Sequence, residues 1–345
     1  MTPTLQITIP TFNRLEKLKA MLGDLSQIGD CVRSGRLRIA VFDNSDSDQV
    51  EYLGAEISDL IEYTWNGGNL GFHGNIRKCL LNGEADFLWL IADDDILKVS
   101  EIPKIIDYLE KHSEKIMGLA LPYEVRYLPD AKSYNEISVT PNFGIIASFG
   151  EIVLTGRIPF DFLASFIIKS DSLSRIDFAN IISQNDYYHS LIYCSCLRQD
   201  DLIGIYDDAI LSYVAPDTLN WSLRSLVDSK NEICDLLINE HQIQMNKSAI
   251  LSEILKWAIF GRIGTTDIRN LENDIGPLVR FALRDRSARN LLLAVLLIAP
   301  SVVAREVAIF ALAISASKNS PQHLLQSLRN MRRIVNSKAR ARKPR

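Results

Sequence analysis

Three consecutive carboxylates follow a run of apolar residues in the first third of the chain. Asp93, Asp94 and Asp95 come directly after residues 87–92, whose sequence is FLWLIA. Like charges this close repel one another, and a hard divalent cation such as Mg²⁺ or Mn²⁺ offsets the repulsion by taking oxygen ligands. Because Asp93 and Asp95 are two positions apart, an extended turn would point both side chains the same way. The spacing predicts a metal site, and a solvated acidic loop or a helix cap is the structural alternative.

Two further polar features lie where predicted strands end. Asp43 closes the run 36–43, and a carboxylate at such a position can accept hydrogen bonds from a ribose hydroxyl or a base N–H. Residues 67–74 form a Gly-rich turn before a predicted helix, where backbone N–H groups can approach phosphates. The turn lacks the Lys and Ser/Thr of a G-x-x-x-x-G-K-[ST] loop. The alternatives are an Asx turn at Asp43 and a capping or packing role for His73.

The elements that must position these residues alternate between strand and helix. Strands are predicted at 5–10, 36–43, 63–66 and 86–92, and helices at 15–28, 51–62, 75–83 and 101–111. Nearly continuous apolar strands indicate a mainly parallel sheet with helices on both faces, an α/β fold. In such sheets ligands bind beyond the carboxyl ends of the strands, which is where the polar residues occur.

The rest of the chain changes character near residue 226. Before it, strands are predicted at 117–122, 162–169, 203–206 and 210–214, with a helix at 186–197. After it the pattern is helical, at 228–246, 248–262, 276–284, 288–299 and 301–317. We therefore expect a domain at 1–225, a helical C-terminal region at 226–320 and a basic tail at 321–345.

Two strongly apolar stretches, 291–299 and 307–316, lie within the C-terminal region. Each is too short for a spanning helix, which needs about 20 apolar residues, and Pro300, Arg305 and Glu306 separate them. One interpretation is a pair of buried bundle helices. The other is a helical hairpin lying on a membrane surface, which would make the protein a peripheral membrane protein.

The charge distribution bears on the same question. Residues 329–345 contain eight Lys or Arg and no acid, which leaves −12 for the rest of a chain whose net charge is −4. Such a tail favours an anionic surface, and a disordered solubilising end is the alternative. The composition, 47% hydrophobic and 23% charged, excludes a disordered chain or a disulfide-stapled miniprotein. Five Cys, without the spacing of a zinc site, indicate reduced thiols and a cytoplasmic protein.

Four motifs in this order resemble a known family. They are residues 9–14 (IPTFNR), 43–45 (DNS), 69–72 (NLGF) and 93–95 (DDD). The set resembles family 2-type glycosyltransferases of the GT-A fold. It is most similar to bacterial enzymes of O-antigen or capsule assembly, including rhamnosyltransferase-like and abequosyltransferase-like members. The resemblance extends over about residues 4–215.

The resemblance implies roles for particular residues. Asp93 and Asp95 would hold a Mn²⁺ or Mg²⁺ ion that bridges the donor diphosphate. Asp43 would bind the base or ribose, and it is compatible with UDP, CDP, GDP or dTDP. The other expected donor-binding residues are Pro10, Thr11, Asn13, Arg14, Asn69, Gly71, Asp93 and Asp94.

The catalytic base is expected in the segment 184–189 (QNDYYH). Many family members carry the base in a Glu-Asp pair, which Asp186 matches at its second position, while Asn185 replaces the Glu. His189 lies three residues later and would share a helix face with Asp186. We favour Asp186 as the base, with His189 second; a helix-capping Asp and a buried, satisfied His are the structural alternatives.

These observations together predict a metal-dependent glycosyltransferase of the hexosyltransferase class (EC 2.4). It would move a sugar from a nucleoside-diphosphate donor to a hydroxyl of a glycan or a polyprenyl-diphosphate-linked acceptor in surface polysaccharide assembly. A membrane-associated hairpin would place it at the inner face of the cytoplasmic membrane.

Two other functions stay open on the sequence. One is a catalytically inactive GT-A-like module that binds a sugar or nucleotide. The other is a sugar nucleotidyltransferase, which would need a Gly-rich basic loop after the first strand, whereas residues 11–15 contain no Gly. Nucleic-acid binding is not expected, because the body of the chain is acidic and carries no reader motif.

Overall fold

A computed structural model describes residues 4–126, 146–154, 162–178, 181, 187–206, 210–214, 218–242 and 267–269. The chain divides into two compact units. One comprises Met1–Ala215 with Ile233–Met245, and the other comprises Pro216–Glu232 with Asn246–Arg345. The predicted helices from 248 onward, both apolar stretches and the basic tail lie outside the described residues. The predicted limits 1–225, 226–320 and 321–345 therefore stay a prediction.

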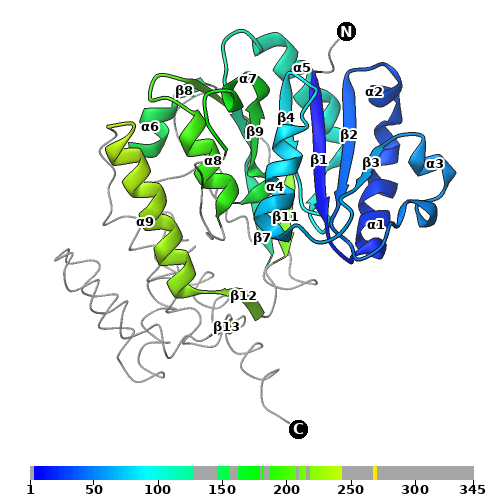
Figure 1. Cartoon of the computed structure of the whole chain (residues 1–345). Coiled ribbons are helices and arrows are strands. Elements are labelled where there is room, and N and C mark those ends of the chain that lie inside the picture. The colour runs from blue at the N-terminus through cyan, green and yellow to red at the C-terminus, as the bar shows by residue number, and fades with distance from the viewer. Residues whose placement is uncertain are drawn as a thin grey trace, which may run out of the picture. The chain divides into compact units, whose positions relative to one another are not determined.

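The first unit is built on a sheet that has eight strands among the described residues, in the order β3-β2-β1-β4-β9-β6-β10-β8 (Figure 1). Along the chain these strands are β1 (Leu5–Thr11), β2 (Leu37–Asp43), β3 (Glu62–Trp65), β4 (Phe87–Leu90), β6 (Gly118–Ala120), β8 (Ile146–Ser148), β9 (Phe166–Lys169) and β10 (Leu202–Ile205). β3, β2, β1 and β4 run parallel to one another, while β9 is antiparallel to both of its neighbours. The predicted mainly parallel sheet is confirmed.

Helices connect these strands. They are α1 (Leu15–Leu25), α2 (Gly29–Arg33), α3 (Ala55–Ser58), α4 (Gly71–Leu81), α5 (Ile102–His112), α6 (Phe149–Leu154), α7 (Ser170–Leu173), α8 (Tyr188–Cys196) and α9 (Leu223–Asn239). Smaller sheets pair β5 (Ile96–Leu97) and β7 (Tyr123–Arg126) with β11 (Leu211–Val214), and β12 (Thr218–Ser222) with β13 (Asp267–Arg269). Within the described residues, no helix is long and apolar enough to cross a bilayer.

Apolar side chains fill both faces of the sheet. Leu5, Ile7 and Ile9 alternate along β1 and pack in one cluster with the buried sides of α1 and α5. Phe42 of β2 and Leu90 of β4 belong to a second cluster, with α4 and α8. The predicted coverage of both faces by helices is thus confirmed (Figure 1).

The spacing of apolar residues explains why helix α5 packs as it does. Its buried residues recur at intervals of three and four positions, which places them on one face: Ile102, Ile105, Ile106 and Leu109. Pro103 lies at the helix start, where its missing N–H leaves no intrahelical bond unmade.

One predicted helix is wrong in extent. The segment 51–62 holds only a 3₁₀ turn at Val50–Tyr52 and the four-residue α3. Gly54 between them has φ of +83°, which no helix allows, so the two turns cannot merge. The strand predicted at 162–169 begins only at Phe166, after a 3₁₀ turn.

Trp89 anchors the centre of β4, the strand that precedes the three carboxylates. Its side chain is fully buried, and its indole N–H donates to the carbonyl oxygen of Ala164 at 2.8 Å. It thereby ties β4 to the segment that leads into β9, and so fixes the strand end that carries the acids.

We expect Trp89→Phe to lower the free energy of unfolding by about 2–3 kcal/mol, because it leaves a cavity and a carbonyl without its donor. Urea denaturation measures this loss. Trp65→Phe is the matched control: that indole also donates to a backbone oxygen, of Ser45 at 2.9 Å, but is 38% exposed. The control should cost less than about 1 kcal/mol. Equal losses in the two variants would contradict the anchoring role.

Candidate functional site

The strand ends bring the predicted polar residues together. Thr11, the last residue of β1, lies opposite Asp43, the last residue of β2, and Asp43 lies opposite Trp65 of β3. On the other side of β1, Thr8 pairs with Leu90, so the chain leaving β4 passes beside Thr11. The predicted meeting of these residues at one edge of the sheet is confirmed.

Asp93 is the buried acid of this edge. Its carboxylate is 3% exposed and accepts a hydrogen bond from the Thr11 hydroxyl at 2.7 Å. Arg14 Nη1 donates to its other oxygen at 3.0 Å. Burial raises the pKa of the Asp93 carboxyl, and these two bonds oppose that rise because they favour the charged form. Asp93 is therefore a desolvated carboxylate whose charge depends on one neighbouring cation.

Asp94 faces solvent and forms ion pairs with two cations. Its carboxylate is 40% exposed and accepts from Arg14 at 3.2 Å and from Lys17 Nζ at 2.8 Å. Lys17 is not among the residues predicted from the sequence. The available signal was its spacing of three residues from Arg14, which puts both side chains on the same side of the first turn of α1.

Asp95 has a different partner. Its carboxylate accepts from its own segment, the backbone N–H of Ala92 at 2.8 Å. Burial raises the pKa of Asp95 to about 7, with neighbouring Asp94 and Asp93 adding to the shift. Asp93 thus bonds across to Thr11 of β1 and to Arg14, whereas Asp95 caps a turn, and the role of the two acids as metal ligands stays a prediction.

The acids fit a divalent cation only in part. Among the described residues, no three His, Cys, Asp or Glu side chains are grouped so as to hold a metal ion. Magnesium is often held by one or two carboxylates, with substrate phosphates and water completing its shell. Asp93 with one neighbouring acid meets that requirement, provided that Arg14 gives up its place on the carboxylate.

Asp43 is fully buried, and its two oxygens are in use. One accepts the backbone N–H of Ser45 at 2.7 Å, and the other accepts the hydroxyl of Tyr63. Burial and the bond to Asp43 raise the pKa of the Tyr63 hydroxyl. The carboxylate thus holds the loop after β2 in place. Its predicted contact with a nucleotide stays a prediction. No pattern in the sequence pairs Tyr63 with Asp43.

Asn13 connects the loops after β1 and β2. Its φ of +51° reverses the chain after Thr11, and its backbone N–H donates to Ser45 Oγ at 2.8 Å. Its side-chain amide donates to Asp46 at 2.9 Å. Pro10 lies within β1, before this reversal. The segment predicted to bind the donor is therefore held in place by hydrogen bonds to the loop after β2.

Asparagines fasten the Gly-rich turn to the strand ends. Asn75 of α4 is buried, and its amide donates to the carbonyl of Phe42 at 3.1 Å. Asn66 donates to the Asn44 side chain at 2.7 Å and to Asn75 at 3.0 Å. Asn69 accepts the Gly71 N–H at 2.7 Å, so the turn itself uses that amide. Helix α4 begins at Gly71, four residues earlier than predicted.

The structure describes only one of the two candidate bases. Asp186 lies outside the described residues. His189 lies in α8, is 5% exposed, and has its ring 6.3 Å from that of Tyr193, which belongs to the second apolar cluster. The preceding residue, Tyr188, packs edge-on against His73 with ring centroids 4.9 Å apart. Helix α8 therefore begins beside the Gly-rich turn.

Large apolar side chains surround the polar edge. Four of them are more than a third exposed. Phe12 follows β1, Trp65 ends β3, and Leu70 and Phe72 lie at the start of α4. Exposed aromatic rings next to charged groups can stack on a base or a sugar ring. Phe12 and Phe72 belong to motifs in the sequence, but this role was not predicted for them.

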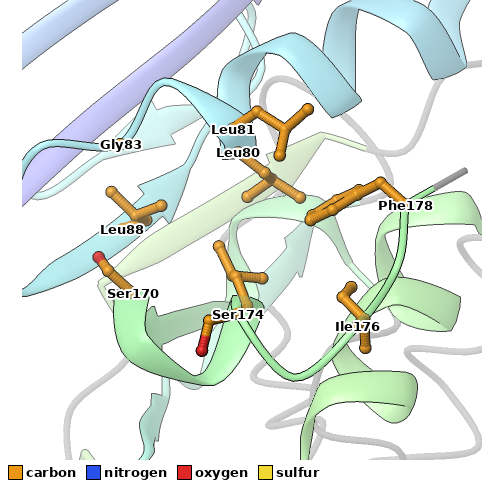
Figure 2. Close-up of a pocket in the computed structure, with 9 residues that line it drawn as sticks. Leu80, Leu81, Gly83, Leu88, Ser170, Ser174, Ile176 and Phe178 are labelled. Atoms are coloured by element: carbon orange, nitrogen blue, oxygen red, sulfur yellow. The ribbon is translucent and has the colours of Figure 1, made fainter.

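The cavity drawn in Figure 2 lies away from this edge. It has a volume of about 290 Å³ and is lined by Leu80, Leu81, Gly83, Leu88, Ser170, Leu173, Ser174, Ile176 and Phe178. These residues belong to the C-terminal end of α4, the early part of β4 and the region of α7. The acids Asp93, Asp94 and Asp95 follow the opposite, carboxyl end of β4.

Comparisons with known proteins agree with this architecture. Residues 6–173 match the family model Glycosyl transferase family 2. S. aureus TarS 1-349 matches at 13% identity and a TM-score of 0.52, covering 99% of this chain and 93% of that one. The same protein in complex with UDP-GlcNAc matches at 14% identity with the same score and coverage. At these identities the likeness concerns the fold, and the predicted GT-A fold is confirmed.

A lower score is found for the mannosyltransferase PcManGT from Pyrobaculum calidifontis in complex with GDP-Man and Mn²⁺. It is 10% identical, with a TM-score of 0.47, and the match covers 98% of this chain and 86% of that one. No curated protein matches the chain.

We expect Tyr63→Phe to reduce the free energy of unfolding by about 1–3 kcal/mol, because it removes a donor from the fully buried Asp43 carboxylate. Chemical denaturation tests this. Tyr52→Phe removes the same hydroxyl from a side chain that is 62% exposed, and should change stability by less than about 0.5 kcal/mol. A wild-type stability for Tyr63→Phe would show that Asp43 does not depend on this bond.

Proposed function

We propose that this chain, whose residues 6–173 match the family model Glycosyl transferase family 2, is a glycosyltransferase that uses a divalent metal ion to move a sugar from a nucleoside-diphosphate donor to a hydroxyl group. The observation that carries the proposal is the pairing of buried Asp93 with Thr11 and Arg14 at the strand ends. A desolvated carboxylate beside a cation at this edge suits a site for a metal-bound diphosphate.

The residues of the edge take distinct parts in this proposal. Asp93, with Asp95 or Asp94, would hold Mn²⁺ or Mg²⁺, which when bound neutralises charge on the leaving diphosphate. Thr11 holds the Asp93 carboxylate in place through its 2.7 Å bond. Asp43 supports the loop after β2, against which the base or ribose would lie. The exposed ring of Trp65 offers a face on which that base or ribose could stack.

The acceptor hydroxyl needs a base. We retain Asp186 in that role, with His189 as the second candidate. The burial of His189, which is 5% exposed, supports the choice, because a base must reach the proton that it removes. Helix α8 begins at Tyr188, two positions after Asp186 in the chain, and its start lies beside the Gly-rich turn, which supports this proposal.

The acceptor is proposed from the sequence. A glycan or a polyprenyl-diphosphate-linked glycan in O-antigen or capsule assembly fits the apolar stretches 291–299 and 307–316 and the basic tail. Exposed Leu70 and Phe72, at the start of α4, give the site an apolar border on which such an acceptor could rest. Contact with the inner face of the cytoplasmic membrane belongs to the same proposal.

We expect one nucleotide among UDP, CDP, GDP and dTDP to bind in the presence of Mn²⁺ and to bind poorly without it. Calorimetry on the full chain measures this. UDP is the first to test, because TarS was solved with UDP-GlcNAc. Asp93→Asn should weaken metal-dependent binding by at least about tenfold, since it removes a charged oxygen ligand.

Asp107→Asn is the matched control, because Asp107 is 67% exposed on α5 and pairs with Arg36. It should bind like wild type. No binding of any of the four nucleotides, with or without Mn²⁺, would overturn the proposed transferase activity and favour an inactive module.

We expect Asp186→Asn to lower kcat by roughly 10²–10⁴-fold, the usual contribution of a general base, with nucleotide binding unchanged. Sugar transfer and calorimetry on the same preparation separate the two effects. Asp200→Asn, at an exposed position after α8, is the control and should keep full activity. If Asp186→Asn is fully active and His189→Gln is inactive but folded, the base is His189 instead.

A further inference from the structure

Two cations from one helix turn neutralise the acids of the site. Arg14 precedes α1 and bonds both Asp93, at 3.0 Å, and Asp94, at 3.2 Å. Lys17, one turn later, bonds Asp94 at 2.8 Å. These four residues make up a cluster of two negative and two positive charges, which we call the counter-ion cluster.

The two sides of the counter-ion cluster differ in their freedom to move. Asp93 is 3% exposed and is fixed by Thr11, so it needs a cation beside it in every state of the protein. Arg14 and Lys17 are 48% and 54% exposed, and the exposed pair of Lys17 with Asp94 is worth little by itself. Their long side chains can therefore leave the carboxylates when another cation arrives.

The charges suggest what that exchange would be. A divalent cation on Asp93 and its neighbour adds two positive charges to a neutral cluster, so it displaces Arg14 and makes the edge strongly positive. The diphosphate of a nucleotide sugar carries two negative charges, which restores neutrality. Guanidinium and ammonium groups both bind phosphate oxygens well, and Arg can do so with two parallel bonds.

We propose that Arg14 and Lys17 are exchangeable counter-ions: they hold Asp93 and Asp94 in the free protein and transfer to the donor diphosphate when a divalent cation occupies the carboxylates. This inference rests on the proposed function and adds Lys17 to its diphosphate site. Both residues bind the leaving group, because the nucleoside diphosphate released by sugar transfer carries one more negative charge than the donor.

The exchange makes metal and diphosphate binding cooperative. Metal alone must compete with Arg14 for Asp93, so it binds weakly. Metal together with a diphosphate binds more tightly, because the displaced cations gain phosphate partners. Removing either cation should therefore strengthen the binding of metal alone and reduce the gain in metal affinity that a diphosphate produces. Loss of a purely structural ion pair would not produce these opposite effects.

The test measures Mn²⁺ binding by the full chain from the electron paramagnetic resonance signal of the free ion, with and without inorganic pyrophosphate, at weakly alkaline pH. Arg14→Gln and Lys17→Gln should bind Mn²⁺ alone more tightly than wild type, by roughly threefold to tenfold for Arg14→Gln. Both should lose most of the increase in Mn²⁺ affinity that pyrophosphate produces in wild type.

Lys19→Gln is the matched control. It removes a positive charge from the same helix, but Lys19 pairs with Glu16 at 3.7 Å instead of with the acids of the site. Its Mn²⁺ binding should equal that of wild type under both conditions. Misfolding is not expected to explain a change in Mn²⁺ binding by Lys17→Gln, because Lys17 is half-exposed and pairs with exposed Asp94 instead of buried Asp93.

Two failures are distinguishable. The exchange is overturned if wild type binds Mn²⁺ and both variants stay within about twofold of it, with the pyrophosphate effect intact. It is also overturned if the variants bind Mn²⁺ alone less tightly. If wild type binds no Mn²⁺ with or without pyrophosphate, the metal site of the proposed function fails, and the exchange fails with it.

Discussion

A buried carboxylate at the end of a central strand is the constraint on which the rest of the site depends. Removing a charged group such as Asp93 from water costs on the order of several kcal/mol unless it has partners. Thr11 and Arg14 supply those partners from the end of β1 and the chain just beyond it. β1 and β4 must therefore be neighbours in one register, because a shift of a single residue would turn the Thr11 side chain to the other face of the sheet. The position of one acid thus fixes how two strands pair.

The same requirement organises the rest of the edge. Asp43 takes donors from Ser45 and Tyr63, and Asn75 bonds the Phe42 carbonyl, so these polar groups have partners inside the protein. Buried polar groups without partners are costly, and the loops after β2 and β3 are therefore held in one arrangement. Rigid loops in turn keep large apolar rings, such as that of Trp65, exposed beside the charged groups. The edge combines a fixed polar frame with an apolar border, as binding sites commonly do.

Electrostatics link this frame to chemistry. Asp93 and Asp94 form a neutral set with the exposed cations Arg14 and Lys17 in the free protein, which keeps Asp93 stable without any ligand. A set balanced in this way responds to added charge of either sign, because the exposed members can change partners while the buried one cannot. Asp95 does not share in this, since its carboxylate caps the turn at Ala92. Three adjacent acids therefore have three different environments, although their side chains are chemically identical.

The sequence by itself determined the four parallel strands β1 to β4 and the edge at which polar residues gather, because apolar runs that end near Thr11 and at Asp43 reflect burial that depends on local pattern. It also indicated Arg14 as part of the site. Only the tertiary structure decided which side chains meet: Lys17 on Asp94, and Tyr63 on Asp43, are 77 and 20 residues apart in the chain. Such pairs have no local signature, because they follow from strand order and side-chain reach. Burial of Asp43 on every side is likewise a property of the packed sheet, which no spacing of residues along the chain can reveal.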